Sequence, residues 1–283
     1  MRYLLVIAIA LSVSQASAAQ QPRLTTWDFE KDGTPKTYEI GGYKLTLTAN
    51  NVGDEWFEPR LSVMAPGMPP ISLTGEEQRY DIHLDFTALK LSSGERPSVV
   101  FTSFTGGMHC CIEVTVLQPT GHRWRKLDLG TWDGTGIYDP RDVDGDGVVD
   151  FLFDDNAFLK EFGPESFQPP IILNVVGGEV VDVSKAKRYS GLYKERIKDD
   201  KLGCAEGANS ACAAYVAESA RIGRFDEAWK FMLSNYEHAA KMMYPSICEG
   251  RIVGHECEGN WVQTTDFPKS LRSFLVEYEY IQK

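Results

Sequence analysis

The stretch CIEVTVLQPTGHRWRKLDLG, residues 111–130, carries the pattern that decides the fold of this chain. Apolar and polar side chains alternate from Ile112 to Val116, as they do in a strand with one buried face. A turn signal at residues 119–121 separates this strand from a second one. The stretch therefore predicts a β-hairpin.

Similar strand patterns lie on both sides of this hairpin. Residues 36–51 predict another hairpin with its turn at Gly41 and Gly42, and residues 79–89 alternate, with Leu84 and Phe86 on one face. Residues 97–104 and 169–184 add further strands, the latter with a turn at residues 177–178. Because no long 3.6-residue period occurs between residues 23 and 183, we expect a β-rich domain over residues 19–185.

The pattern changes after Lys185. Residues 209–243 predict two helices broken at Gly223 and Arg224, and residues 266–283 predict a third amphipathic helix. The apolar stripe of the second helix comprises Phe225, Ala228, Trp229, Met232, Leu233, Tyr236 and Ala240. We therefore predict an α+β fold, in which propeller-blade-like or sandwich sheets precede a small, disulfide-braced helical domain over residues 186–283.

The first 18 residues have the three-part pattern of a secretory signal peptide. Arg2 supplies the positive charge, an apolar run extends to Leu11, and a small-residue cleavage signal ends at Ala18. This run is too short to span a membrane, and no other apolar run approaches the ~20 residues that a spanning helix needs. We expect cleavage near Ala18, a periplasmic or secreted location and no membrane span.

The net charge of the chain argues against a nucleic-acid partner. The chain has 29 basic and 40 acidic residues and a net charge of −11. A nucleic-acid binder needs a basic footprint, which this composition does not provide. An acidic chain suits binding of divalent cations.

One short loop concentrates the acidic residues. The stretch DVDGDGVVD, residues 142–150, places aspartates at its first, third, fifth and ninth positions. Alternate oxygen ligands in one loop suit Ca²⁺, and Gly145 and Gly147 allow the sharp turn. An EF-hand would need a glutamate at the twelfth position, which is Phe153 here. The predicted Ca²⁺ ligands are the side chains of Asp142, Asp144, Asp146 and Asp150 and the carbonyl oxygen of Val148.

The nine-residue loop followed by a strand resembles the calcium loop of FG-GAP repeats, the unit of integrin-type β-propellers. That resemblance implies the same five ligands. The wider combination of FTGGMHCC, the acidic loop and a cysteine-bearing helical tail with GRFDEAWKFM resembles a group of uncharacterised exported proteins of Gram-negative bacteria. This second resemblance covers roughly residues 97–236 and implies a periplasmic location without implying an activity.

Six cysteines in an exported chain favour disulfides over a metal site. Four of them lie in the predicted helical domain and can pair in three ways, one of which is Cys204–Cys212 with Cys248–Cys257. Cys248, His255 and Cys257 would also suit zinc, but disulfides are the simpler interpretation. The disulfide candidates are Cys110, Cys111, Cys204, Cys212, Cys248 and Cys257.

The adjacent pair Cys110 and Cys111 raises a separate question. Neighbouring Cα atoms are about 3.8 Å apart across a trans peptide, closer than in ordinary disulfides, and successive strand residues face opposite ways. We therefore expect that these two cysteines do not pair with each other. His109 beside them could form a Cys–His nucleophile, although the sequence offers no third group to orient it.

Trp132 and Tyr138 precede the acidic loop, where they could stack on sugar rings or cover the apolar side of the loop. The sequence favours a non-enzymatic, calcium-stabilised module that binds an envelope protein or a glycan, with no nucleic-acid partner. The alternative is a hydrolase or thiol-redox protein that uses His109 with Cys110 or Cys111.

Overall fold

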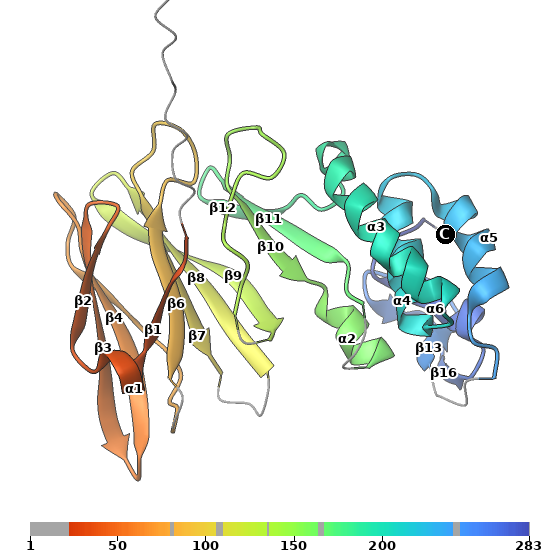
Figure 1. Cartoon of the computed structure of the whole chain (residues 1–283), viewed down its shortest axis with the longest axis horizontal. Helices are drawn as coiled ribbons and strands as arrows, with labels where there is room; N and C mark the ends of the chain where they lie inside the picture. The colour runs from red at the N-terminus through yellow and green to blue at the C-terminus, as the bar shows by residue number, and fades with distance from the viewer. Residues whose placement is uncertain are drawn as a thin grey trace, which may run out of the picture.

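The computed structural model describes residues 23–79, 82–105, 110–134, 136–163, 167–239 and 244–282. Three β-sheets of three to five strands follow one another along the long axis of the molecule and lead into a helical part (Figure 1). The predicted α+β class is confirmed: a β-rich region with several sheets precedes a helical region that contains disulfides. The sheets stack face to face, as in a sandwich, and are not arranged radially like propeller blades.

The first sheet has four strands in the order β2-β3-β4-β5, and the predicted hairpin at residues 36–51 forms its β2–β3 pair. Gly41 and Gly42 both have positive φ, which a two-residue hairpin turn of this kind requires. The strands are β2 (Lys36–Ile40), β3 (Tyr43–Gly53), β4 (Trp56–Met64) and β5 (Ile71–Thr74).

The second sheet has five strands in the order β1-β6-β7-β8-β9, all antiparallel. The predicted hairpin at residues 111–130 forms the centre of its β8–β9 pair, in which Thr120 lies opposite Arg123. A short helix, α1 (Phe29–Asp32), follows its first strand. The strands are β1 (Thr25–Asp28), β6 (His83–Leu89), β7 (Ser98–Phe104), β8 (Cys110–Thr120) and β9 (Arg123–Asp133).

The five-stranded sheet is covered on both faces at its centre, where β7 is buried along nearly its whole length. Val99 and Phe101 point into a core shared with the four-stranded sheet, whereas Val100 points into a second core. The second core also contains Phe151 and Phe153 of the third sheet. Strand alternation thus joins three layers through one central sheet.

The third sheet is an antiparallel meander of β10 (Asp150–Asp154), β11 (Pro170–Val176) and β12 (Glu179–Asp182). It too is buried on both faces, because Leu152 points away from Phe151 and Phe153 into the helical core. The helix α2 (Asn156–Phe162) follows β10, and its N-terminus is capped by the side chain of Asp155. We did not predict this helix, which places Phe158 and Phe162 in the helical core.

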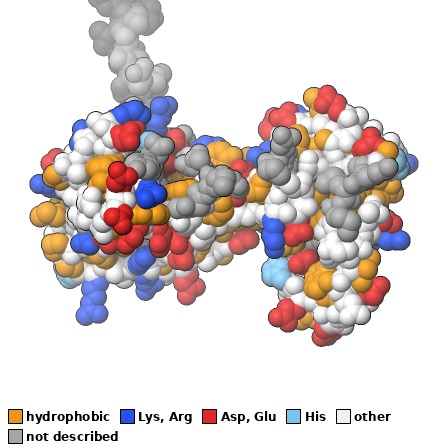
Figure 2. All heavy atoms as spheres, turned by 90° about the horizontal axis from the view of Figure 1, so that it is seen from below, with side chains coloured by type: hydrophobic (Ala, Val, Ile, Leu, Met, Phe, Trp, Pro, Cys, Tyr) orange, Lys and Arg blue, Asp and Glu red, His pale blue; other side chains and the backbone are white. Residues whose placement is uncertain are grey.

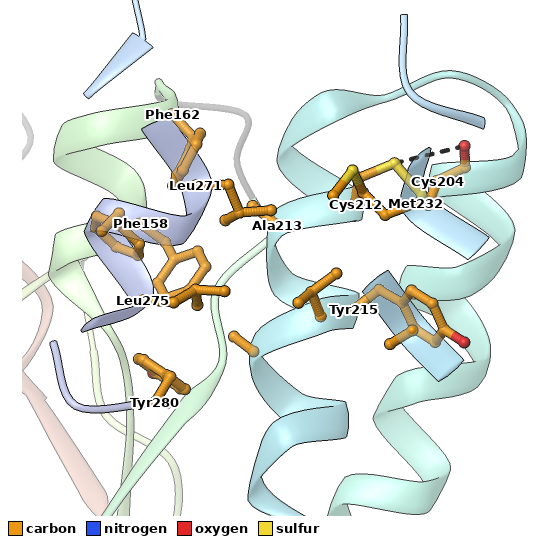
Figure 3. Packing of buried hydrophobic residues seen from close by; sticks show 14 of the residues in the cluster. Phe158, Phe162, Cys204, Cys212, Ala213, Tyr215, Met232, Leu271, Leu275 and Tyr280 are labelled. Carbon is orange, nitrogen blue, oxygen red and sulfur yellow. Dashed lines mark hydrogen bonds between the residues drawn. A yellow bond between two sulfur atoms is a disulfide. The ribbon is translucent and has the colours of Figure 1, made fainter. Parts of the chain in front are cut away.

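The helical part comprises the 3₁₀ turn η1 (Lys187–Tyr189) and the helices α3 (Ser190–Ala205), α4 (Asn209–Arg221), α5 (Phe225–Asn235) and α6 (Phe267–Glu277). Phe158 and Phe162 of α2 pack against α6, where their rings meet that of Phe274 edge to face at centroid distances of 4.9 and 5.1 Å. In Figure 3 both side chains lie beside Leu271 and Leu275 of α6. The Cys204–Cys212 disulfide joins α3 to α4 on the other side of this core (Figure 3). The core therefore includes residues on both sides of the predicted boundary at residue 185.

Two sequence predictions need adjustment in this part. We did not predict α3, because its buried stripe of Tyr193, Ile197 and Cys204 passes through the acidic Asp200. The second predicted helix, α5, ends at Asn235, and Tyr236 is extended; Ala240 lies outside the described residues. The break before α5 and the start of α6 occur where we predicted them.

Residues 244–264 form two small sheets that precede α6. Strand β13 (Tyr244–Cys248) pairs with β16 (Trp261–Thr264), and β14 (Ile252–Val253) pairs with β15 (Glu256–Cys257). A disulfide joins Cys248 to Cys257 across this segment. No helix in the part of the chain that the structure describes combines the length and the apolarity needed to cross a bilayer.

Candidate metal centre

The acidic loop is closed by hydrogen bonds from its own backbone. Asp142 accepts from the N–H groups of Gly145 and Gly147 at 2.7 and 2.9 Å. The Oδ1 atoms of Asp144 and Asp146 accept from N–H groups two residues further on, at 3.0 and 2.8 Å. Both glycines have positive φ, as the tight loop requires. The loop leads into a strand, β10, and not into a helix.

Three of the four predicted side-chain ligands converge. Asp142, Asp144 and Asp146 each offer a carboxylate oxygen, and these atoms lie within 4.8 Å of one another. Oxygens bound to one Ca²⁺ at 2.3–2.6 Å are at most about 5 Å apart, so the cluster has suitable dimensions. The Asp144 side chain is 1% exposed, and its Oδ2 forms an ion pair with the Arg188 guanidinium. The three converging carboxylates fit a calcium-class ion, and in this structure Arg188 supplies the positive charge that the buried Asp144 oxygen requires.

Asp150, the fourth predicted side-chain ligand, lies outside this cluster. It is fully buried, and its Oδ2 accepts a hydrogen bond from the N–H of Val143 at 2.8 Å. Its Oδ1 accepts from the Asn174 amide at 2.7 Å and from the Tyr189 hydroxyl at 2.5 Å. In this structure Asp150 anchors the loop to β11 and η1. Val148, the predicted carbonyl ligand, forms an isolated β-bridge with Ser92.

A cation from the helical part already contacts the loop. The Arg188 guanidinium forms an ion pair with Asp144 through Nε, and the same nitrogen lies 3.7 Å from Asp146 Oδ2. Its Nη2 donates a hydrogen bond to Asn174 Oδ1 at 3.1 Å. Burial raises the pKa of the neighbouring Tyr189, so its hydroxyl remains a donor to Asp150. We did not predict Arg188 or Tyr189, because both lie about 40 residues beyond the loop.

The six cysteines form three disulfides: Cys110–Cys111, Cys204–Cys212 and Cys248–Cys257. Our expectation that Cys110 and Cys111 do not pair with each other is wrong. It assumed a trans peptide and regular strand alternation, whereas this peptide is cis, the Cα atoms are 3.0 Å apart, and the β8–β9 register shifts at this point. His109 lies outside the described residues.

Trp132 and Tyr138 occupy different surroundings. The Trp132 indole stacks on Phe153 with a centroid distance of 4.1 Å, and its N–H donates to the Leu129 carbonyl at 2.9 Å. This ring therefore covers the second core and leaves little free face for a sugar. Tyr138 is half exposed, and its hydroxyl donates to Asp154 at 3.0 Å.

A buried pair of acids links α3 to α4. Glu218 is 0% and Asp200 5% exposed, and burial raises the pKa of Glu218 to about 8 and that of Asp200 to about 6. Arg196 Nε donates to Glu218 Oε1 at 2.8 Å. One carboxylate is therefore balanced by Arg196 and the other by a proton. In the sequence, Glu218 is an acidic residue within the run of small residues that forms α4. Its partners Asp200 and Arg196 lie on α3, so the sequence alone does not reveal the pair.

Two adjoining pockets have volumes of about 610 and 390 Å³. The smaller one lies where β9 and the third sheet meet the helical part, whereas the larger one is lined by Lys185 and by residues between 220 and 282 of the helical part. They share Lys185, Arg221 and Glu279 as lining residues. The smaller pocket also contacts Trp132 and His255, but not Tyr138. Figure 2 shows the molecule narrowing to a waist between its two bodies.

Arg221 gives the pockets a cation without a carboxylate partner among the described residues. Its guanidinium lies 4.0 Å from the centre of the Tyr280 ring, and Nη1 donates to the Glu279 carbonyl at 3.3 Å. Glu279 has φ of +57°, in the left-handed region, and its carboxylate pairs with Lys185. This conformation ends α6, because the N–H groups of Glu279 and Tyr280 donate to the carbonyls of Val276 and Leu275, as in a Schellman motif.

The fold and the site together define a disulfide-braced, multi-sheet protein with an acidic loop at the edge of its third sheet. The chain belongs to the family of the probable thylakoid lumen protein sll0997 of Synechocystis sp., to which it is 30% identical over 246 residues, covering 81% of this chain and 69% of that protein. The family described as the sll0997 C-terminal domain matches residues 186–279.

A second relative is the uncharacterized protein y4bJ of Sinorhizobium fredii, which is 26% identical over 273 residues. The match covers 91% of this chain but only 42% of that protein, so this chain spans less than half of the rhizobial relative. No solved structure matches the chain. The names of the two relatives, an uncharacterized protein and a probable thylakoid lumen protein, agree with the coarser expectation of uncharacterised, exported relatives, and neither name states an activity.

Proposed function

We propose that this chain is an exported, non-enzymatic binding module that Ca²⁺ stabilises and that recognises an envelope protein or a glycan. The observation that carries the proposal is the convergence of Asp142, Asp144 and Asp146, whose carboxylate oxygens lie within 4.8 Å of one another. The resemblance of the loop to FG-GAP calcium loops supports the same ion.

The position of the loop supports a stabilising role for Ca²⁺. The loop leads into β10, whose side chains lie in two of the three cores, and Asp150 is hydrogen-bonded to Tyr189 of the helical part. An ion that holds the loop would therefore hold the junction between the two parts. Extracellular modules bind Ca²⁺ with a Kd of about 10⁻⁴–10⁻³ M. A free Ca²⁺ concentration ten times the Kd would add about 1.4 kcal/mol to the free energy of unfolding.

The junction pockets support a binding role. They combine the cation of Arg221 with the paired Lys185 and Glu279 and with the imidazole of His255. Concave sites with a few converging polar groups are where proteins bind ligands. Export is supported by the signal-peptide pattern at residues 1–18 and by the name of the Synechocystis relative, a probable lumen protein.

Thermal unfolding of residues 19–283, in calcium and in chelator, tests the ion. We expect calcium to raise the midpoint of the wild-type chain and to leave Asp144→Asn unchanged, because Asp144 supplies the buried ligand oxygen. Asp226→Asn, which removes the same charge from the exposed surface of α5, is the matched control and should respond like the wild type. Equal midpoints in calcium and chelator for the wild-type chain would remove the calcium part of the proposal.

Retention of a partner from envelope extract tests the binding role. Wild-type protein, Arg221→Ala and the control Arg123→Ala, whose side chain is exposed on β9, serve as immobilised baits with and without chelator. We expect one partner to be retained in calcium by the wild type and the control and to be lost with Arg221→Ala. Equal retention by all three baits would contradict recognition at the pockets.

The alternative function is a hydrolase or thiol-redox protein that uses His109 with Cys110 or Cys111. It requires a free thiol. All six cysteines are disulfide-bonded, so a thiol nucleophile requires prior reduction of the Cys110–Cys111 bond. Counting thiols in the native protein, before and after mild reduction, separates the two functions. Two thiols that appear at native pH without unfolding would favour the alternative.

A further inference from the structure

We infer that Arg188 is an internal counter-ion of the acidic loop, and that Ca²⁺ displaces its guanidinium when the ion binds. The inference rests on the proposed calcium site and describes its regulation. It assigns to the Arg188 side chain a position that depends on whether the loop holds an ion.

Arg188 contacts two of the oxygens that a metal in the loop would use. The Oδ1 atoms of Asp144 and Asp146 accept hydrogen bonds from the loop backbone, whereas their Oδ2 atoms both face Arg188 Nε, through an ion pair with Asp144 and at 3.7 Å from Asp146. A guanidinium N–H and a metal ion cannot occupy the same position between these two oxygens.

The burial of the two partners differs in a way that favours exchange. The Asp144 side chain is 1% exposed and is held by the loop, whereas the Arg188 side chain is 41% exposed. Water can hydrate the Arg188 guanidinium when it leaves the loop, whereas the Asp144 carboxylate stays buried. Exchange of the arginine for a metal ion therefore costs little free energy.

Arg188 also keeps a second contact that is independent of the loop. Its Nη2 donates to Asn174 Oδ1 at 3.1 Å, on β11. Asn174 and Tyr189 both donate to Asp150, which stays buried. Displacement by Ca²⁺ therefore frees the guanidinium from the loop while η1 stays attached through Tyr189, and the change is confined to the start of the helical part.

Calcium titration by calorimetry of residues 19–283 tests this competition in the wild type, Arg188→Ala and Lys187→Ala. Lys187→Ala removes the same charge from the adjacent, exposed position of η1 and is the matched control. Loss of the competing ion pair should lower the calcium Kd of Arg188→Ala by about fivefold, with a smaller change in the control. The Arg188 Nε–H NMR signal, assigned by its absence from Arg188→Ala, should shift in wild-type protein as calcium is added.

The outcomes separate the inference from the function on which it rests. If the wild type binds calcium and Arg188→Ala binds it equally or more weakly, Arg188 does not compete and the inference is overturned. If neither binds calcium, the proposed function fails first, and the inference falls with it. Should Arg188→Ala not fold in chelator, Arg188→Gln, which keeps a polar side chain with N–H donors but removes the charge, replaces it in the same titration.

Discussion

The buried acid pair between α3 and α4 should make the stability of this protein depend on pH in an unusual direction. Glu218 and Asp200 each have a buried oxygen without a hydrogen-bond donor among the described residues, and Arg196 balances only one negative charge. Burial is the main cause that raises the pKa of Glu218 to about 8, and the charge of Asp200 adds to it. The folded pair therefore retains a proton at neutral pH.

The sign and size of the effect follow from linkage. In the unfolded chain Glu218 titrates near its ordinary value of 4.5, whereas in the folded chain it titrates near 8. Between these values the folded state binds one more proton, so the free energy of unfolding falls as pH rises, by up to about 1.4 kcal/mol per pH unit. Over the two units from pH 5 to pH 7 this amounts to roughly 2–3 kcal/mol.

Glu218→Gln should remove this dependence. Its amide oxygen can still accept from Arg196 and its amide nitrogen can donate to Asp200, so it mimics the protonated acid at every pH. We expect the variant to match the wild type near pH 5 and to become progressively more stable than the wild type toward pH 7. Glu206→Gln, at an exposed position between the same two helices, is the matched control and should follow the wild-type curve.

Urea unfolding at pH 5, 6 and 7 measures the free energy of unfolding of the wild type, Glu218→Gln and Glu206→Gln. Other acids with raised pKa values affect all three proteins alike, so their contribution cancels when a variant is compared with the wild type. Parallel curves for Glu218→Gln and the wild type would refute the reasoning, because they would mean that the pair does not hold a proton in the folded state.

Three further tests concern a hairpin turn, a disulfide and the packing of α2. Gly41→Ala should cost at least about 1–2 kcal/mol more than Gly42→Ala in chemical unfolding, because both glycines have positive φ but only at Gly41 would a Cβ meet a backbone carbonyl, at 2.9 Å. Replacing Cys248 and Cys257 together by serine should lower the free energy of unfolding by about 2.5 kcal/mol, as loop-closure entropy predicts for a nine-residue separation. Phe158→Ala should cost about 3–5 kcal/mol by the same assay, since this fully buried ring packs against α6; a loss below 1 kcal/mol would mean that α2 does not anchor the two parts.

Local patterns in the sequence predicted the elements whose residues alternate or repeat without interruption. The β2–β3 and β8–β9 hairpins and the start of α6 are of this kind, because turn residues and apolar spacing act over a few positions. The helix α3 was missed, since its buried face includes Asp200, whose burial becomes acceptable only beside Arg196 and Glu218. Tertiary contacts stabilise α3, and a local sequence pattern cannot predict such contacts.

The candidate site shows the same division. The spacing of Asp142, Asp144 and Asp146 was sufficient to group their oxygens, because all three belong to one loop. The position of Asp150 and the arrival of Arg188 depend on β11 and η1, which the sequence does not place near the loop. The pairing of Cys110 with Cys111 was mispredicted because strand alternation does not extend through their cis peptide.

The three-stranded sheet of β10, β11 and β12 has a consequence for how this protein can be divided. It presents Phe151 to the sandwich and Leu152 to the helices, so each body uses it as one wall of its interior. A fragment that ends at residue 185 would leave Leu152 and Ile172 facing water, and a fragment that starts there would lack the aromatic rings of α2. We therefore expect each fragment to be less stable than the whole chain, and the two bodies to melt together in a single cooperative transition.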